Sequence, residues 1–185
     1  MRNLPVNLKR HLAALVPFVL LCSTGFTAPA SPELMERLQN ADEAEARRIT
    51  KEIELEWSKS GSAAMDLLLR RGREAVREGK FGLAIEHLTA LTDHAPAFAE
   101  GYHARAEAYF RSNLYGPALD DLEIALALDP QHYEAMFGLA VMLHEFGNLR
   151  QAARLYRHVL ALNPNHKNAA EALSSLKRDG IGREL

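Results

Sequence analysis

Three columns of residues recur at a spacing of thirty-four, and this period constrains the architecture of the chain more than any other feature. The columns are Gly72, Ala106 and Ala140; Ala84, Ala118 and Ala152; and Pro96, Pro130 and Pro164. A strict period of this length indicates stacked copies of one supersecondary unit. Each unit then contacts mainly its neighbours, and function resides on an extended surface.

The stretches between these columns predict helices joined by short turns. No segment alternates apolar and polar residues with a period of two, so we expect no strands. Gly79, Asn113 and Gly147 mark the turn inside each helix pair, because glycine and asparagine tolerate the left-handed backbone of a helix end. The prolines mark the turns between pairs. The expected helices are 63–78, 81–94, 98–111, 115–128, 132–145, 149–161 and about 166–178.

The small residues in the columns have a packing role. Two antiparallel helices approach most closely where a side chain is small, at the low end of the usual spacing of about 8–10 Å. Glycine or alanine stands at that point on the first helix of each pair, and alanine on the second. A bulky replacement such as Ala118→Leu is therefore expected to destabilise the fold, by roughly 1–3 kcal/mol.

These columns resemble the tetratricopeptide repeat (TPR) family over about 65–166. The resemblance implies an all-α fold, an α-α superhelix (TPR solenoid) of three helix-turn-helix repeats at about 65–98, 99–132 and 133–166. A capping helix at 166–178 would complete a TPR domain spanning 63–178. The first repeat departs from the pattern, with Leu68 and Ala75 where the family often has aromatics. The alternative, an irregular helical bundle, does not explain nine matched positions.

Residues 1–30 have the pattern of a secretory signal peptide. A start with three basic residues precedes the apolar stretch 12–22, which is too short to span a bilayer comfortably. Ala28 and Ala30 then supply small residues where a signal peptidase reads the chain. We expect cleavage after Ala30 and a periplasmic or secreted protein; an uncleaved membrane anchor is the alternative. Leu21 before Cys22 argues against a lipoprotein signal.

Cleavage after Ala30 would change the charge and the redox chemistry of the chain. It removes three cations and no anion, so the formal net charge falls from -2 to −5. It also removes Cys22, the only cysteine, so the fold would depend on packing without disulfides. No basic stripe supports binding to nucleic acid.

The segment 31–62 carries no repeat signature but contains an amphipathic helix. Ala46, Ile49, Ile53 and Trp57 follow steps of three and four, which places them on one face. We expect this segment to pack on the first repeat and cover its apolar edge, since terminal units need a polar outer face. The stretch 57–69 resembles exported bacterial TPR proteins. The tail 179–185 is expected to be frayed.

The TPR resemblance implies a concave groove lined by the first helix of each pair. The candidate peptide-binding residues are Leu69, Arg73, Val76, Glu100, His103, Glu107, Phe110, Glu134, Phe137, Val141 and His144. Phe110, Phe137 and Val141 are expected to expose apolar side chains, which often marks an interaction site. The alternative is that the N-terminal or last helix folds over the groove and buries them.

Some TPR proteins hold a partner's carboxylate terminus in this groove with lysine, asparagine and arginine. The matching columns here contain Leu69, Arg73, Ala104, Glu134 and Gly138, of which only Arg73 suits that task. The sequence therefore favours a peptide or helix of mixed apolar and charged character, docked in a groove.

No catalytic or metal-binding motif accompanies the repeats. The sequence contains no HExxH pair, cysteine cluster, GxSxG or glycine-rich phosphate loop. We expect no catalytic residues, no metal and no cofactor, and not an enzyme. The predicted function is an exported protein–protein interaction module, an adaptor, scaffold or assembly factor. It would act as a monomer or weak homo-oligomer, without membrane insertion after cleavage. The alternatives are a self-associating structural or assembly protein of the cell envelope and a non-catalytic subunit of an enzyme complex.

Overall fold

The computed structural model describes residues 30–178, and within that range every regular element is an α-helix. The predicted all-α class is confirmed, and each helix from α3 onward begins and ends within one residue of its expected bounds. The rest of the expected signal peptide, 1–29, and the tail, 179–185, lie outside the described residues. The helices are α1 (Pro32–Asn40), α2 (Glu43–Trp57), α3 (Ala63–Arg77), α4 (Phe81–His94), α5 (Ala99–Arg111), α6 (Tyr115–Leu128), α7 (Tyr133–Glu145), α8 (Leu149–Leu162) and α9 (Lys167–Arg178).

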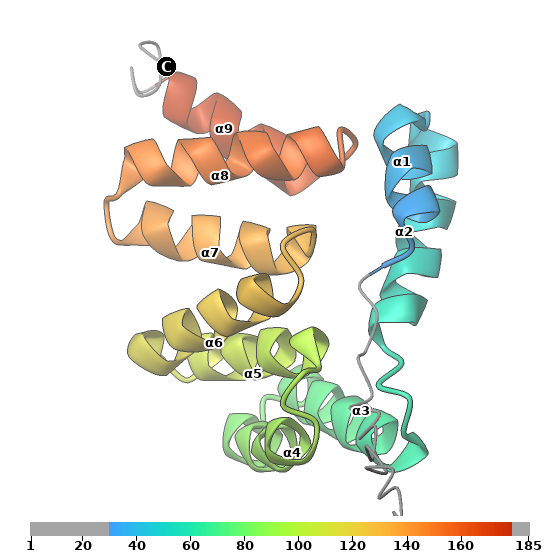
Figure 1. Ribbon diagram of the computed structural model, residues 1–185. Coiled ribbons are helices and arrows are strands. Elements are labelled where there is room, and N and C mark those ends of the chain that lie inside the picture. The colour runs from blue at the N-terminus through green and yellow to red at the C-terminus, as the bar shows by residue number, and fades with distance from the viewer. Residues whose placement is uncertain (1–29, 179–185) are drawn as a thin grey trace, which may run out of the picture.

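Helices α3–α4, α5–α6 and α7–α8 form three pairs that stack on one another, and α9 packs on α8 at the end of the stack (Figure 1). The turns inside the pairs use a left-handed backbone at Gly79, Asn113 and Gly147, with φ of 73°, 60° and 79°. This is the conformation for which the sequence places glycine or asparagine there. None of the helices within residues 30–178 combines the length and apolar character needed to cross a membrane.

The small residues of the two columns lie where the helices of each pair meet. Ala84, Ala118, Ala140 and Ala152 are completely buried. At Gly72 the approach is so close that an added Cβ would lie 2.4 Å from Cγ of Leu88. The predicted packing role of these columns is confirmed.

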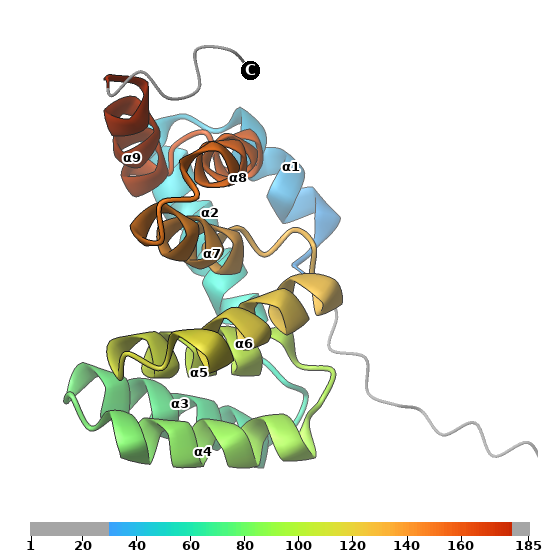
Figure 2. The ribbon, with the colours of Figure 1, turned by 90° about the vertical axis from the view of Figure 1, so that its left-hand side faces the viewer.

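The N-terminal helices α1 and α2 pack on the third repeat, so the expectation that they cover the first repeat was wrong. The predicted stripe of α2 is buried, but in one core with Tyr133, Met136 and Tyr156 of α7 and α8. Two views show α2 standing beside the stack and crossing the repeat helices (Figures 1 and 2). Trp57 stacks on His132 and lies against Tyr133 at the start of α7, and no period in the sequence reveals these contacts.

Candidate functional site

Helix α2 separates clefts along the concave face of the solenoid, and two of these clefts contain predicted groove residues. Its first residue lies beside α9, where Lys167 Nζ is 2.7 Å from Glu43 Oε1, and its end reaches α3, where Arg73 contacts Ser58. The cleft between α2 and helices α3, α5 and α7 has a volume of about 630 Å³, and we call it the polar chamber. It is lined by Lys51, Glu54, Leu55, Trp57, Ser58, Arg73, Arg77, Glu100, His103, His132 and Glu134.

The second cleft lies between α5, α7 and α9, on the side of the groove that α2 leaves open. Its volume is about 470 Å³, and we call it the apolar chamber. His103 and Glu134 line both chambers and form the wall between them. The apolar chamber is lined by His103, Ala106, Glu107, Phe110, Arg111, Leu122, Glu134, Phe137, Gly138, Val141, Met142 and Asn168.

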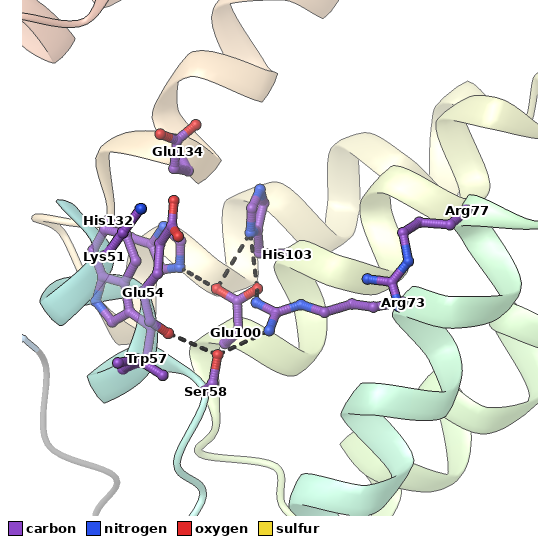
Figure 3. Close-up of a pocket in the computed structure, with 11 residues that line it drawn as sticks. Lys51, Glu54, Trp57, Ser58, Arg73, Arg77, Glu100, His103, His132 and Glu134 are labelled. Carbon is purple, nitrogen blue, oxygen red and sulfur yellow. Dashed lines mark hydrogen bonds and ion pairs between the residues drawn. The ribbon is translucent and has the colours of Figure 1, made fainter. Parts of the chain in front are cut away.

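The carboxylate of Glu100 is the centre of the polar chamber (Figure 3). It accepts a hydrogen bond from Arg73 Nη2 at 2.5 Å, and His132 Nε2 lies 2.7 Å from its Oε2. His103 Nδ1 lies 3.3 Å from both of its oxygens. Since Glu100 is only 3% exposed, these contacts replace the water that a buried carboxylate needs. One side chain thus joins the first repeat to the second and to His132, the N-cap of α7.

This environment moves the pKa values of Glu100 and His103 apart. Burial by itself would raise the pKa of Glu100, but the charge and hydrogen bonds of His103 and the contact with His132 outweigh it and hold the pKa well below its usual range. Burial would lower the pKa of His103, but the carboxylates of Glu100 and Glu134 outweigh it and raise the pKa. The two groups therefore favour an ion pair.

His132 has a fixed role as a helix cap. The backbone N–H of Ala135 donates to Nδ1 of His132 at the start of α7, so this ring is neutral and carries its proton on Nε2. That nitrogen then donates to Glu100. His166 repeats the arrangement one unit later: Ala169 N donates to its Nδ1, and its Nε2 lies 3.5 Å from Glu134 Oε1.

The indole of Trp57 fastens α2 to this cluster. Its ring stacks on His132, with centroids 3.9 Å apart and planes 7° from parallel. Its Nε1 donates to Asp129 Oδ2 at 3.0 Å. One residue later, Ser58 Oγ accepts from Arg73 Nη1 at 2.8 Å. The end of α2 is therefore tied to the first repeat and to the junction of the second and third.

Glu100, His103 and His132 are the residues within the described range whose atoms lie close enough to share a metal ion, all within 4.8 Å of one another. The donor set does not fit a metal. Metal binding at Nε2 of His132 would need a free lone pair there, but the cap at Nδ1 keeps the proton on Nε2. Arg73 also holds a positive charge against the same carboxylate. The geometry is that of an internal ion-pair network.

The apolar chamber keeps part of its aromatic surface open. Phe110, Phe137 and Val141 are each partly buried. Phe137 rests on Tyr156 and His166, with ring centroids 5.8 and 4.7 Å away, and Phe110 meets the ring of Tyr115 edge-on at 5.7 Å. These contacts hold the rings in place and leave one side of each toward the cleft. Such a surface has the rigid apolar anchors that binding sites commonly use.

The structure distributes the predicted groove residues unevenly. Arg73, Glu100, His103 and Glu134 line the polar chamber, and Glu107, Phe110, Phe137 and Val141 join His103 and Glu134 in the apolar one. Leu69 does not belong to the groove: it is 1% exposed and lies in the core of the first repeat. Val76 packs against that core, and His144 lies 3.4 Å from the hydroxyl of Tyr156. Helix α2 covers the part of the groove that holds Arg73 and Glu100, but it does not line the chamber of Phe110, Phe137 and Val141, the three residues that the alternative expected a covering helix to bury.

Sequence reasoning missed His132, His166 and the contribution of α2. A signal for the two histidines was present, since they are thirty-four residues apart, as are their partners Glu100 and Glu134. The first repeat breaks this column with Phe98. No comparable pattern in the sequence predicts that Lys51, Glu54 and Trp57 face the groove, because α2 precedes the repeated segment.

Comparisons with known proteins agree with this architecture. The family model of the tetratricopeptide repeat matches residues 69–122 and 103–167. A TPR repeat-containing protein of Rhizobium etli is 30% identical over 135 residues, which is 73% of this chain and 66% of that protein. Sperm-associated antigen 1 of Mus musculus is 31% identical over 109 residues, 59% of this chain and 12% of that protein. The chain thus spans less than two thirds of either relative.

Among solved structures, the first TPR domain of Spaghetti (RPAP3), bound to the HSP90 peptide SRMEEVD, is similar with a TM-score of 0.61. It is 27% identical, and the match covers 64% of this chain and 94% of that domain. TPR folds are generally non-catalytic modules that bind other proteins. With three stacked helix pairs, small residues that recur where the helices of each pair meet, and a family model matched across 69–167, the chain belongs to the tetratricopeptide repeat family.

Proposed function

We propose that this chain is an exported interaction module that binds a peptide segment or short helix of another protein in the apolar chamber. The observation that carries the proposal is the open cleft between α5, α7 and α9, floored by Phe110, Phe137 and Val141. Partly buried aromatic rings held by their neighbours offer contact area with little loss of conformational entropy on binding. The protein would serve as an adaptor, scaffold or assembly factor.

The polar chamber suits an internal role better than ligand capture. Glu100 is already satisfied by three partners, and Arg73 is engaged by Glu100 and Ser58. The HSP90 peptide of the solved neighbour ends in Glu-Glu-Val-Asp. An equivalent acidic end finds no free basic set at the matching positions here, since Leu69 and Ala104 are buried and Arg73 is paired. A segment with apolar anchors is the better fit.

The proposal of export rests on the leader pattern of residues 1–30, and one contact lies next to the expected cleavage point. The backbone nitrogen of Ser31 donates to Glu56 Oε2 at 2.9 Å. Cleavage after Ala30 would turn this nitrogen into an ammonium group and the hydrogen bond into an ion pair. It would also remove Ala30, whose side chain is a small part of the core. Determining the N-terminal residue and the compartment of the protein purified from its own cells tests this part of the proposal.

Crosslinking in the native cells tests the groove. The double variant Phe110→Ala, Phe137→Ala should capture less of the partner, because each lost anchor weakens binding by more than about 1 kcal/mol. The matched control is Leu83→Ala, Leu128→Ala, which removes exposed apolar side chains that lie outside both chambers. Equal capture by both double variants, at equal thermal stability, would refute the proposal. Light scattering of the purified chain distinguishes a monomer from a weak homo-oligomer.

A further inference from the structure

We infer that the segment bound in the apolar chamber is basic as well as apolar, with lysine or arginine side chains that lie across Phe110 and Phe137 and pair with Glu107 and Glu134. This inference rests on the proposed function, because it names the chemistry of the partner for the same site. It is carried by the way the chamber combines each aromatic ring with a carboxylate.

The same pairing occurs on both helices that floor the chamber. On α5, Glu107 precedes Phe110 by three residues, and on α7, Glu134 precedes Phe137 by three. Side chains at this spacing lie next to each other on one face of a helix. All four residues line the chamber. The floor therefore presents two aromatic rings, each with an acidic group one turn before it.

An aromatic ring beside a carboxylate is a favourable site for a basic side chain. The methylene stem of lysine or arginine packs on the ring, the positive head is attracted to the ring face, and the head pairs with the carboxylate. An acidic side chain placed on either ring would meet the carboxylate beside it as a like charge. The cationic groups of the chamber, Arg111 and His103, already face Glu107 and Glu100. The formal charge of the whole chain, -2, favours basic partners in the same sense.

Neither carboxylate is fully used by the protein itself. Glu107 is about half exposed, and its contact with Arg111 spans 3.8 Å between two solvated side chains, a kind of pair that contributes little. Glu134 is one third exposed and lies 3.5 Å from His166. Burial would raise the pKa of Glu134, but the hydrogen bond from His166 and the charge of His103 outweigh it and hold the pKa below its usual value, so the group is ionised at neutral pH. Both carboxylates can accept a further cation.

Three designed helical peptides test the inference. All carry leucine at the same helical spacing, and their remaining positions are lysine in the first, glutamate in the second and glutamine in the third. Calorimetric titration of the full-length chain at about 0.15 M salt should give binding of the lysine peptide about tenfold tighter than that of the glutamate peptide. The double variant Glu107→Gln, Glu134→Gln should lose this preference. The control Glu86→Gln, Glu123→Gln removes two exposed carboxylates outside both chambers and should keep it.

The outcomes separate the two proposals. If the glutamate or glutamine peptide binds as tightly as the lysine peptide, the basic character of the partner is refuted, while docking in the chamber stands. If none of the three binds, docking in the chamber is refuted as well. The inference is also refuted if the preference for the lysine peptide persists in Glu107→Gln, Glu134→Gln, or if it is lost in Glu86→Gln, Glu123→Gln. Either result would mean that the basic side chains bind elsewhere.

A substitution of Arg111 provides a second test, in which binding of the lysine peptide should become stronger rather than weaker. Its guanidinium lies at the edge of the chamber beside Glu107, where it competes with a basic ligand. Arg111→Gln should therefore strengthen binding of the lysine peptide about twofold to threefold. Weaker binding of that peptide by this variant would contradict the assigned position of its basic groups.

Discussion

The Nε2 of His132 donates to the carboxylate of Glu100 at 2.7 Å, while its Nδ1 caps helix α7 by accepting from the backbone of Ala135. One imidazole thereby connects the second repeat to the third and gives Trp57 a surface on which to stack. The same cluster holds the wall of the proposed binding chamber, because His103 contacts Glu100 on the other side. The stability of the solenoid and the shape of its groove therefore depend on one buried carboxylate.

Removing that carboxylate should be costly. We expect Glu100→Ala to lower the free energy of unfolding by about 3–5 kcal/mol, because the buried His132 and the partly buried Arg73 and His103 lose their shared acceptor. Glu100→Gln keeps the shape and one acceptor oxygen, so its loss should be smaller. Urea unfolding followed by fluorescence of Trp57, the only tryptophan, measures both. Wild-type stability in the alanine variant would show that the cluster is not a structural node.

Stability should also fall on both sides of a pH plateau. The pKa of Glu100 is lowered in the folded protein, so its contribution is present above the ordinary value of 4.5 and is lost as pH falls through the folded pKa. The pKa of His103 is raised, so its contribution is present below the ordinary value of 6.5 and is lost as pH rises through the folded pKa. The measurement is the free energy of unfolding from pH 3 to pH 9.

A difference experiment isolates the contribution of His103. The stability difference between the wild type and His103→Asn should shrink as pH rises above 6.5, because neutral histidine no longer pairs with Glu100. A difference that stays constant across this range would mean that His103 does not titrate against Glu100.

The close approach at Gly72 gives a sharp packing test. We expect Gly72→Ala to destabilise the fold by about 1–3 kcal/mol, although alanine favours helices, because the new Cβ would lie 2.4 Å from Cγ of Leu88. The matched control is Gly82→Ala in α4, where a Cβ meets nothing within 4 Å. This control should stabilise the fold by about 0.5–1 kcal/mol. Thermal unfolding of the two variants tests this expectation. Equal effects of Gly72→Ala and Gly82→Ala on stability would contradict the packing role of Gly72.

The anchoring of α2 can be tested at its end. Trp57→Ala should cost about 3–5 kcal/mol, because it removes a large buried ring that stacks on His132. Trp57→Phe keeps an aromatic ring but loses the hydrogen bond to Asp129, so its loss should be smaller. Hydrogen exchange of the backbone amides of α2 shows whether the lost stability is lost in this helix. Unchanged protection of α2 in the alanine variant would show that the other contacts of the helix suffice.

The repeat architecture was predictable because its interactions are local. Gly72, Ala106 and Ala140 each contact the next helix of their own pair. The requirement for a small residue therefore arises inside each repeat and recurs in the next one. The turns at Gly79, Asn113 and Gly147 require a left-handed backbone, which few residue types adopt. The helix bounds followed from these turns together with the prolines that mark the turns between pairs.

The candidate site was predictable only in part. The resemblance to the repeat family indicated which helices line the groove, and helical position on them then gave Phe110, Phe137, Glu107 and Glu134. It placed Leu69 in the groove as well, although the helix turns that side chain into the core. A small error in the rotation of a helix moves a residue from the surface to the interior, and helical position alone does not resolve it.

By itself the sequence determined the stack of three helix pairs and its capping helix, because each contact there joins neighbouring units that share one pattern. Only the tertiary structure decided that α2 returns to the third repeat and divides the groove. The contacts that place it join residues far apart in the chain, 72 positions between Trp57 and Asp129 and 124 between Ala41 and Asn165. Such contacts depend on complementary shape and polarity at single positions, so no repetition in the sequence reveals them.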